Sequence, residues 1–276
     1  MTIRHPLFSR LCQDTPLIMG ILNVTPDSFS DGGMFGAVEA AHAHAMIMLA
    51  EGADIIDVGG ESTRPGHEEV SAEDEQARVL PVLAAISPIA HAQNVPISID
   101  TYKAATAEAA LKAGATVIND VWGLQREPDI AHVAAAHGAP VIVMHNRTEI
   151  DPSLQVIDEL CQFFDRSIAI AHQAGIDDGS IILDPGIGFG KTPAQSMEAL
   201  SRLSELRARG YPILVGASRK SFIGALINQP PQERLYGTLS AHMFAVAQGA
   251  DILRVHDVRP HVEAKRVWKA LVAAGE

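Results

Sequence analysis

Acidic and amide side chains follow several of the short apolar runs in this sequence. Asn23 follows "LIMGIL", Asp100 ends "PISID", Asn119 follows "TVI" and Asp184 ends "SIILD". Such groups could bind a ligand that carries hydrogen-bond donors, since an unpaired buried carboxylate costs free energy. The alternative is that Asp100, Asn119 and Asp184 are helix N-caps or turn residues, because Asp and Asn also favour those places.

Cationic side chains follow three of the runs: Arg64 after one, Arg219 and Lys220 after another, and Arg254 with His256 after a third. Adjacent Arg219 and Lys220 would repel each other on most surfaces, so their pairing predicts a multiply charged anion such as phosphate or pyrophosphate. The alternative is that "SRK" begins a solvated helix. Of the 12 histidines only His256 is predicted to be functional, and no His or Cys spacing typical of a metal site occurs.

Eight short apolar or β-branched runs are the elements that must position these side chains. The predicted strands cover residues 17–22, 55–58, 96–99, 116–118, 140–144, 181–183, 212–215 and 252–255. Segments rich in Ala, Leu and Glu that predict helices include residues 37–51, 72–86, 103–113 and 154–174. The glycines predicted to end helices in the left-handed conformation are Gly52, Gly114, Gly138, Gly175, Gly210 and Gly249.

The alternation of eight strands with eight helices predicts an α/β fold, a single (β/α)8 TIM barrel. Strands buried on both faces are near-continuously apolar, as these runs are. The alternative is an open, doubly wound sheet, and residues 218–249 are long enough for two helices. In a barrel, the polar residues after the eight strands surround one opening, where the active sites of this fold lie.

The composition predicts one domain, residues 1–276, in which residues 1–16 are an N-terminal extension. The net charge of −12 argues against nucleic acid as a partner, though not against a small anionic substrate. No run reaches the roughly 18 apolar residues of a membrane span, and the first 16 residues lack the apolar core of a signal peptide. Two cysteines are too few for a disulfide framework. We therefore expect a cytoplasmic protein without nucleic-acid or membrane partners.

The segment "DPGIGFGKT" is similar to a phosphate-binding loop but does not match one. The Walker pattern requires a glycine where Pro185 stands, and the segment follows the sixth predicted strand rather than the first. We interpret Thr192 as a helix N-cap and Pro193 as the first helical residue. The glycines are predicted to let the backbone approach a flat ligand. Met144, at the end of "PVIVM", is predicted either to lie in the core or to contact such a ligand.

Seven motifs in order carry a resemblance to a known family: "MGILNVTPDSFSDGG", "DVGGESTRPG", "SIDTYKA", "VINDVWG", "LDPGIGFGKT", "LVGASRKSFIG" and "RVHDV". Over nearly the whole chain, from about Leu17 onward, the sequence resembles the dihydropteroate synthases. The resemblance implies a (β/α)8 barrel that works in folate biosynthesis. It also implies a transferase that joins 4-aminobenzoate to (7,8-dihydropterin-6-yl)methyl diphosphate and releases pyrophosphate.

Matching motifs transfer the family's roles to this chain. The pterin would be held by Asp100, Asn119, Met144, Asp184 and Lys220. The pyrophosphate would be held by Asn23, Thr63, Arg64, Arg254 and His256. The 4-aminobenzoate site would be formed by Phe29, Thr63, Pro65, Phe189, Ser218 and Arg219. The catalytic residues would be Asp100, Lys220, Arg254 and His256.

The resemblance also implies Mg²⁺ as the cofactor, with Asn23 as its ligand. One neutral amide cannot hold Mg²⁺ alone, so we expect the ion to bind appreciably only together with the pyrophosphate. Residues 24–33 and 62–66, after the first two strands, are predicted to be mobile loops that close over bound pyrophosphate. We therefore expect the pterin diphosphate to bind before 4-aminobenzoate. A homodimer and competition by sulfonamides for the 4-aminobenzoate site are implied by the family alone.

Two other functions are alternatives: a pterin-dependent methyltransferase barrel, and a catalytically silent pterin-binding paralogue. The methyltransferase would not need the cations of "SRK" and "RVHD". A silent paralogue would be expected to have lost one of Asn23, Lys220, Arg254 or His256, and all four are present. One segment departs from the family: many relatives read like "MHMQG-P" where this chain has "MHNRTEID", which leaves the contacts of Arg147 open.

Overall fold

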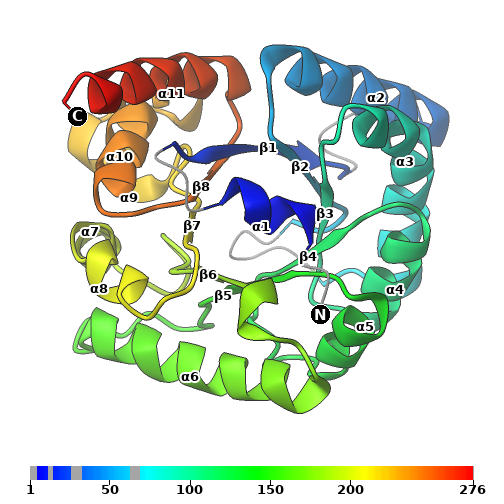
Figure 1. The fold of residues 1–276 in the computed structure, drawn as a ribbon, viewed down its shortest axis with the longest axis horizontal. Helices are drawn as coiled ribbons and strands as arrows, with labels where there is room; N and C mark the ends of the chain where they lie inside the picture. The colour runs from blue at the N-terminus through cyan, green and yellow to red at the C-terminus, as the bar shows by residue number, and fades with distance from the viewer. Residues whose placement is uncertain (1–4, 12–14, 26–32, 63–68, 276) are drawn as a thin grey trace.

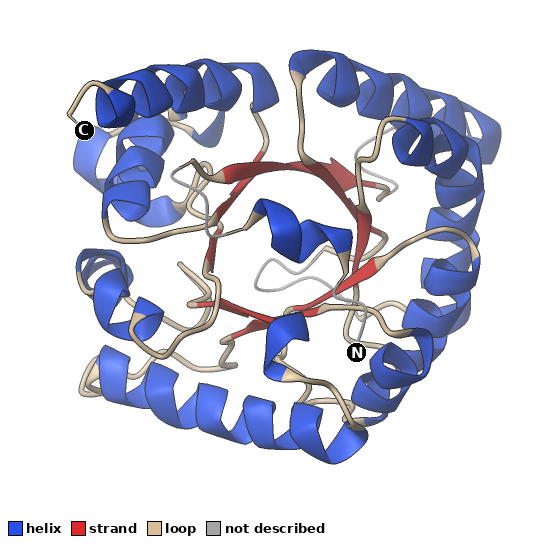
Figure 2. Cartoon of the chain, viewed as in Figure 1, coloured by secondary structure: helices blue, strands red, loops and turns tan. Residues whose placement is uncertain are grey.

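Eight parallel strands form one ring in the computed structural model, which describes residues 5–11, 15–25, 33–62 and 69–275, and only the backbone of residues 33–35. The strands are β1 (Leu17–Asn23), β2 (Ile55–Gly59), β3 (Ile97–Asp100), β4 (Val117–Asp120), β5 (Val141–Met144), β6 (Ile181–Asp184), β7 (Leu214–Val215) and β8 (Ile252–Val255). Their order is β6-β5-β4-β3-β2-β1-β8-β7, and a bridge between Leu183 and Ile213 joins the two ends. The predicted barrel is confirmed and the doubly wound alternative is wrong (Figure 2).

Helices pack around the ring of strands, and all but the first lie on its outside (Figure 1). They are α1 (Pro6–Arg10), α2 (Gly33–Glu51), α3 (Ala72–Ala92), α4 (Ala104–Lys112), α5 (Asp129–His137), α6 (Val156–Ala174), α7 (Pro193–Ser201), α8 (Leu203–Arg207), α9 (Ser221–Ile227), α10 (Leu235–Ala247) and α11 (Val258–Ala273), with short 3₁₀ turns η2 (Asp178–Ser180) and η3 (Pro231–Glu233). The two helices expected within residues 218–249 are α9 and α10. The predicted alternation of one strand with one helix also fails between β6 and β7, where both α7 and α8 lie.

Local sequence signals set the ends of these helices. All six glycines predicted to end helices adopt positive φ, between 61° and 110°. Thr192 is the N-cap of α7, as predicted, and it forms a capping box with Gln195 while Pro193 occupies the first turn. The predicted end of α3 at residue 86 is wrong. That helix continues past Pro88 to Ala92, and Ile86, Ser87 and Ala90 on this part are buried.

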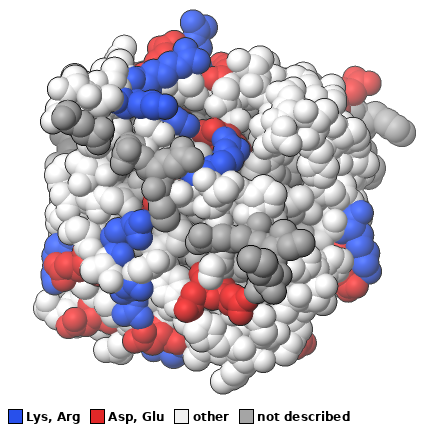
Figure 3. Space-filling view, in the orientation of Figure 1, with Lys and Arg blue, Asp and Glu red and all other residues white. Residues whose placement is uncertain are grey.

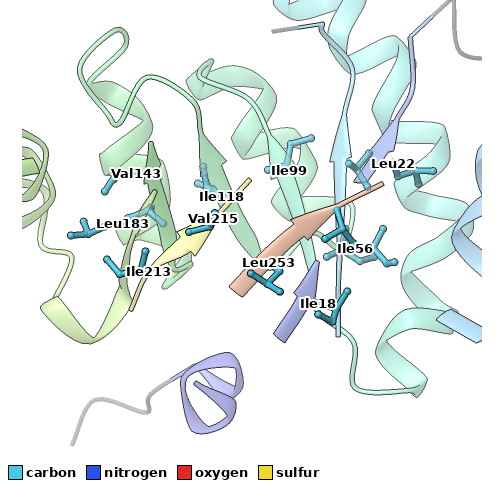
Figure 4. Packing of buried hydrophobic residues seen from close by; sticks show 14 of the residues in the cluster. Ile18, Leu22, Ile56, Ile99, Ile118, Val143, Leu183, Ile213, Val215 and Leu253 are labelled. Carbon is cyan, nitrogen blue, oxygen red and sulfur yellow. The ribbon is translucent and has the colours of Figure 1, made fainter. Parts of the chain in front are cut away.

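Two apolar clusters lie on opposite faces of the strands. The outward side chains, among them Ile18, Ile56, Ile118 and Leu253, pack between the strands and the helices (Figure 4). The inward side chains at the amino ends of the strands form a second cluster inside the barrel, of Leu17, Met19, Ile55, Val117, Ile142, Ile182, Leu214 and Ile252. We call this second cluster the lower layer.

Helix α1 closes the end of the barrel where the strands begin. Its Leu7 and Phe8, with Leu11 after it, join the lower layer and are at most 5% exposed, and Figure 1 shows the helix crossing the ring. Arg10 and Lys265 of α11 both contact Asp54, which also accepts from the backbone N–H of Ile18 at 2.9 Å. The predicted N-terminal extension therefore contributes to the core and seals one end of the barrel.

The surface at the α1 end carries charges of both signs. In Figure 3 lysine and arginine side chains lie beside aspartate and glutamate over a largely uncharged surface. Among the helices that the structure describes, none is long and apolar enough to cross a membrane. The other end of the barrel, where the strands finish, holds a different set of side chains.

Candidate active site

The inward positions nearer the carboxyl ends of the strands are polar, and we call them the upper layer. Side chains two residues apart on a strand face the same side, so on five strands an upper-layer residue stands above a lower-layer one. The pairs are Ile55 with Asp57, Val117 with Asn119, Ile142 with Met144, Ile182 with Asp184, and Ile252 with Arg254. Strand β3 adds Ser98, level with Asp57, and Asp100 two residues later. The same strands that build the core therefore hold the site.

Arg254 joins three strands of the upper layer. Its Nε donates to Asp57 Oδ2 at 2.6 Å and its Nη2 donates to Asp100 Oδ2 at 2.7 Å. Asp57 is fully buried and also accepts from the Ser98 hydroxyl and from Asn119 Nδ2, the latter at 3.3 Å. One guanidinium thus balances two buried carboxylates.

Two buried acceptors beside this network lack donors. Asp100 Oδ1 and Asn119 Oδ1 find no hydrogen-bond partner among the residues that the structure describes. Leaving such atoms unsatisfied costs about 1–3 kcal/mol each. The capping alternative is wrong for Asp100, because its side chain pairs with Arg254, and the N-cap of α4 is Lys103, with no side-chain hydrogen bond at that end. A ligand that offers N–H donors would satisfy both oxygens.

An open cavity lies above this network. Its walls are Asn119, Val121, Met144, Asp184, Gly186, Ile187, Phe189, Gly216, Lys220 and Arg254. Met144 packs with Tyr102 and Val121 and also lines the cavity, while its contact with a flat ligand stays a prediction. Lys220 Nζ lies 3.9 Å from the centre of the Phe189 ring, a cation–π contact. Lys220 is therefore no solvated start of a helix, although α9 does begin directly after it.

Burial raises the pKa of both carboxyl groups that end β3 and β6. For Asp184 the pKa rises to about 6, against the opposing effects of the Gly186 N–H, which donates at 2.7 Å, and of Lys220. The turn-forming role considered for Asp184 is thus present alongside its place in the cavity wall. For Asp100, burial raises the pKa, Arg254 opposes the rise, and the nearby carboxylate of Asp57 adds to it.

The glycine-rich turn after β6 is fixed against the turn after β5. Gly186 has φ +62°, and a Cβ there would lie 1.9 Å from the carbonyl oxygen of His145, so only glycine fits. Lys191 Nζ lies 2.6 Å from His145 Nδ1 and donates to the carbonyl oxygens of Gly186 and Phe189 at 3.0 and 3.1 Å. The glycines thus serve close contact between two loops as well as access to the cavity.

The loops after β7 and β8 are linked to each other. His256 Nδ1 lies 2.9 Å from Ser218 Oγ, and Arg219 donates two bonds to the carboxylate of Asp257, the shorter at 2.7 Å. The adjacent cations Arg219 and Lys220 each have a partner in the free chain. Arg219 pairs with Asp257, and Lys220 lies over the Phe189 ring. A bound anion is therefore not needed to explain why the two cations are neighbours.

A buried histidine pair adds a third link between the same loops. His242 Nε2 accepts from the N–H of Ala217 at 3.0 Å, so its Nδ1 carries the proton that reaches His261 Nε2 at 2.9 Å. His261 Nδ1 then donates to the carbonyl oxygen of Asp257 at 2.6 Å. Burial lowers the pKa of both rings, which keeps them neutral.

Several residues predicted from the resemblance cannot be placed. Phe29, Thr63, Arg64 and Pro65 lie outside the described residues, as do most of the two loops expected to be mobile. Asn23 ends β1, half-buried and level with Gly59. In the part of the chain that is described, no group of three or more His, Cys, Asp or Glu side chains is arranged to hold a metal.

Sequence reasoning missed Asp57, Ser98 and Lys191. Asp57 interrupts the apolar run "IIDVGG", and an acidic residue in a strand buried on both faces was the signal that could have revealed it. Lys191 was read only as part of a failed phosphate-binding motif. His145 is not among the predicted functional residues; it is 1% exposed and contacts Lys191.

Comparison with known proteins identifies what this arrangement resembles. A family model described as "Pterin binding enzyme" matches residues 19–256. The dihydropteroate synthase of Bacillus subtilis is 46% identical over 95% of this chain and 91% of its own. The dihydropteroate synthase of Clostridium difficile, solved in the presence of pteroic acid, superposes with a TM-score of 0.88 at 47% identity, over 93% of this chain and 97% of that one. That of Xanthomonas albilineans with 4-aminobenzoic acid gives a TM-score of 0.89 at 44% identity, over 94% of each chain.

Proposed function

Because the chain belongs to the pterin-binding enzymes, and among them to the dihydropteroate synthases, we propose how the upper layer carries out that reaction. The enzyme is a transferase of folate biosynthesis that joins 4-aminobenzoate to (7,8-dihydropterin-6-yl)methyl diphosphate, giving 7,8-dihydropteroate and pyrophosphate. The observation that carries the proposal is the pair of orphaned acceptors, Asp100 Oδ1 and Asn119 Oδ1, beside a cavity that Asp184 lines.

The pterin is proposed to fill the cavity with its aminopyrimidinone edge towards these acceptors. An amino group and a ring N–H are adjacent donors, which suit a carboxylate such as Asp184 and the free oxygens of Asp100 and Asn119. Met144 and Phe189 offer apolar surface to the flat ring. Arg254 would lie at the floor, because its guanidinium is held there by Asp57 and Asp100.

The proposed chemistry is dissociative. The bond between the methylene carbon and the diphosphate oxygen breaks, its electron pair leaves with pyrophosphate, and the pterin becomes a cation. The 4-aminobenzoate nitrogen then forms the new bond with its lone pair and afterwards releases a proton to water. The carboxylate of Asp100 would stabilise the cation. No side chain has to act as a nucleophile in this scheme.

The leaving diphosphate would lie over the ends of β1 and β8. Arg254 has N–H groups beyond the two that bind carboxylates, and His256, positioned by Ser218, is half-buried nearby on the same strand end. Asn23 would contribute from β1, and Thr63 and Arg64 from the second loop remain part of this prediction. These residues would neutralise charge that develops on the leaving group.

We propose that Mg²⁺ enters as the companion of the diphosphate rather than as a resident ion. At the end of β1, the side-chain metal ligand that we consider among the described residues is the neutral amide oxygen of Asn23, and Mg²⁺ prefers anionic oxygens. With the diphosphate bound, the ion would supply further neutralisation of the leaving charge. Calorimetry with MgCl₂ and free enzyme should show no tight binding, whereas added pyrophosphate should produce it; tight binding to the free enzyme would contradict this proposal.

The 4-aminobenzoate end is proposed to include Ser218, Arg219 and Phe189, with Phe29, Thr63 and Pro65 from loops outside the described residues. Arg219 would have to share its guanidinium between Asp257 and the substrate carboxylate, since two donors already reach Asp257. Sulfonamides, as analogues of 4-aminobenzoate, would compete at the same end.

We also propose a homodimer that forms through α9, α10 and α11, which lie side by side in Figure 1. These helices carry most of the large exposed apolar side chains: Leu226, Ile227, Tyr236, Phe244, Val267 and Leu271. Tyr236, 83% exposed, and Phe244 are the natural sites to disrupt. Light scattering should find a dimer in the wild type and a monomer after Phe244→Glu, while a wild-type monomer would contradict this. A cytoplasmic location is proposed as well, and the free thiol of Cys161 suits a reducing compartment.

Pyrophosphate release tests the proposed site. Purified enzyme with the pterin diphosphate, Mg²⁺ and 4-aminobenzoate should release pyrophosphate, and Lys220→Ala should reduce the rate by about 10²-fold or more. Lys112→Ala, which removes a lysine 63% exposed on α4, is the matched control and should leave the rate unchanged. Tight pterin binding without release in the wild type would favour the silent paralogue instead.

A further inference from the structure

Lys191 is a buried cation that the proposed mechanism does not use. The residue is 5% exposed, and its ammonium meets three neutral acceptors: His145 Nδ1, the Gly186 carbonyl and the Phe189 carbonyl. None of the ion pairs between described residues includes it. Lysines are almost never buried without a paired charge, and holding one on neutral acceptors costs free energy. Such a cost indicates a role beyond packing.

The two carbonyls that Lys191 binds belong to the turn that walls the cavity. Gly186, Ile187 and Phe189 all line it, and the Phe189 N–H closes the turn by donating to the same Gly186 oxygen at 3.0 Å. The Phe189 ring in turn supports Lys220. The position of the wall and of Lys220 therefore depends on the bonds that Lys191 makes.

We infer that Lys191 is a positioning residue, which fixes the Gly186–Phe189 turn as a wall of the pterin site and places a positive charge behind Asp184. This inference rests on the proposed pterin site. The charge favours the ionised form of Asp184, and that form is the one able to accept from an aminopyrimidinone edge.

The protonation state of Lys191 depends on the groups around it. Burial lowers its pKa to about 7, with Asp184 and Glu159 opposing the change and Lys220 and Arg147 adding to it. As an ammonium it donates to all three acceptors. As an amine it keeps two donors for the two carbonyls, and its lone pair can accept from His145 Nδ1, so the turn stays held while the charge behind Asp184 is lost.

Steady-state kinetics against pH, with Lys191→Met and Lys191→Gln, test the inference. We expect Lys191→Met to raise KM for the pterin diphosphate about tenfold or more and KM for 4-aminobenzoate less than twofold. We expect both variants to move the acid limb of kcat/KM for the pterin to higher pH, since both remove the charge, and Lys191→Gln to recover part of the pterin KM because it keeps two donors.

The matched control is Lys265→Met, which removes a lysine 21% exposed at the opposite end of the barrel, paired with Asp54. It should lower the melting temperature without moving either KM or the acid limb. The inference is overturned if Lys191→Met behaves like this control, or if both KM values rise equally while the acid limb stays in place. Failure of the pterin site itself is distinct, because wild-type enzyme would then show no calorimetric binding of the pterin.

If neither Lys191 variant folds, wild-type enzyme labelled with ¹³C at the lysine ε-carbons decides the question. We expect the signal of Lys191, distinguished from that of Lys220 by the spectrum of Lys220→Ala, to shift when the pterin binds. If no lysine signal other than that of Lys220 moves on binding, the inference is overturned.

Discussion

The two layers inside the barrel are built by the same strands on the same inward face, yet they do opposite things. Ile182 of the lower layer is fully buried in an apolar cluster that α1 seals, while Asp184, two residues along, lines an open cavity. Ile252 and Arg254 differ in the same way. A step of two residues along a strand therefore separates the part of the barrel that holds the fold together from the part that is proposed to bind the substrate.

The difference has an energetic meaning. Burial of the lower layer stabilises the fold, at about 25 cal/mol per Å² of apolar surface. The upper layer contains carboxyl groups whose pKa is raised by burial, and two buried oxygens that lack hydrogen-bond donors. These features weaken the free protein, and a ligand that donates hydrogen bonds to the two oxygens would offset part of that cost. Changes in the two layers should thus be separable by experiment.

The largest effect is expected for Arg254→Met. Without the guanidinium, Asp57 and Asp100 face each other unpaired, so the free energy of unfolding should fall by about 3–5 kcal/mol, and the rate should fall with it. Urea denaturation and pyrophosphate release measure the two quantities. If the variant unfolds like the wild type, the account of one guanidinium balancing two buried carboxylates is wrong.

Ile182→Ala should lower stability strongly without changing substrate binding. The residue is fully buried in the lower layer, so a cavity should cost about 2–5 kcal/mol of stability. Both KM values should stay within twofold of the wild type at a temperature where the variant is folded. A selective rise in the pterin KM would show that the layers are not separate.

The raised pKa of Asp184 should give protein stability and pterin affinity opposite pH dependences. Its pKa is about 6 in the folded protein and about 3.9 when unfolded, so its stabilising effect is fully present below pH 4 and is lost as the pH rises through 6. Asp184→Asn should therefore be more stable than the wild type at pH 7, by up to about 3 kcal/mol at ~1.4 kcal/mol per pH unit, and equal to it near pH 4.

Pterin affinity should run the other way, because binding uses the ionised carboxylate. It should be constant above about pH 6.5 and fall by up to tenfold per pH unit below 6. Melting temperatures of the two proteins and calorimetric titrations across pH 4–8 provide the test. A stability difference that does not change with pH would mean that Asp184 is not held at a raised pKa.

The smallest effect is expected on the outer surface. Glu263→Gln breaks an ion pair with Arg259 on α11 in which the side chains are 61% and 72% exposed. Pairs of this kind contribute about 0.3–0.5 kcal/mol, so neither unfolding nor kinetics should change beyond that. A larger loss would indicate that α11 contributes more than packing against the barrel.

The sequence was sufficient to predict most of the barrel, because most strand residues are apolar and several helices have a local end signal such as Gly138 or Thr192. It also predicted which residues meet at one mouth, among them Asn119, Asp184 and Lys220, since a barrel brings strand ends together. Their roles towards substrate stay predictions that the experiments above address.

The rest depends on contacts between distant strands. Arg254 binds Asp57, 197 residues earlier in the chain. The register of β1, β2 and β8 puts Arg254 level with Met19 and Ile55, so its long side chain reaches Asp57 two residues further along β2. Lys191 could not be understood before the turn after β6 was seen against His145. The apolar residues of α1 gave no periodic signal of their own, and their place beneath the barrel follows from the lower layer they cover.

The upper layer, and not the lower layer, is proposed to take part in recognising the pterin. Calorimetric titration of the pterin diphosphate with Mg²⁺ into wild type, Asp184→Asn and Ile182→Val at pH 7.5 tests it most directly. The account predicts a loss of affinity of about 30-fold or more for Asp184→Asn, consistent with loss of a charged hydrogen bond at about 1.5–3 kcal/mol, and a change within twofold for Ile182→Val. Equal losses in both variants, or full affinity in Asp184→Asn, would contradict it.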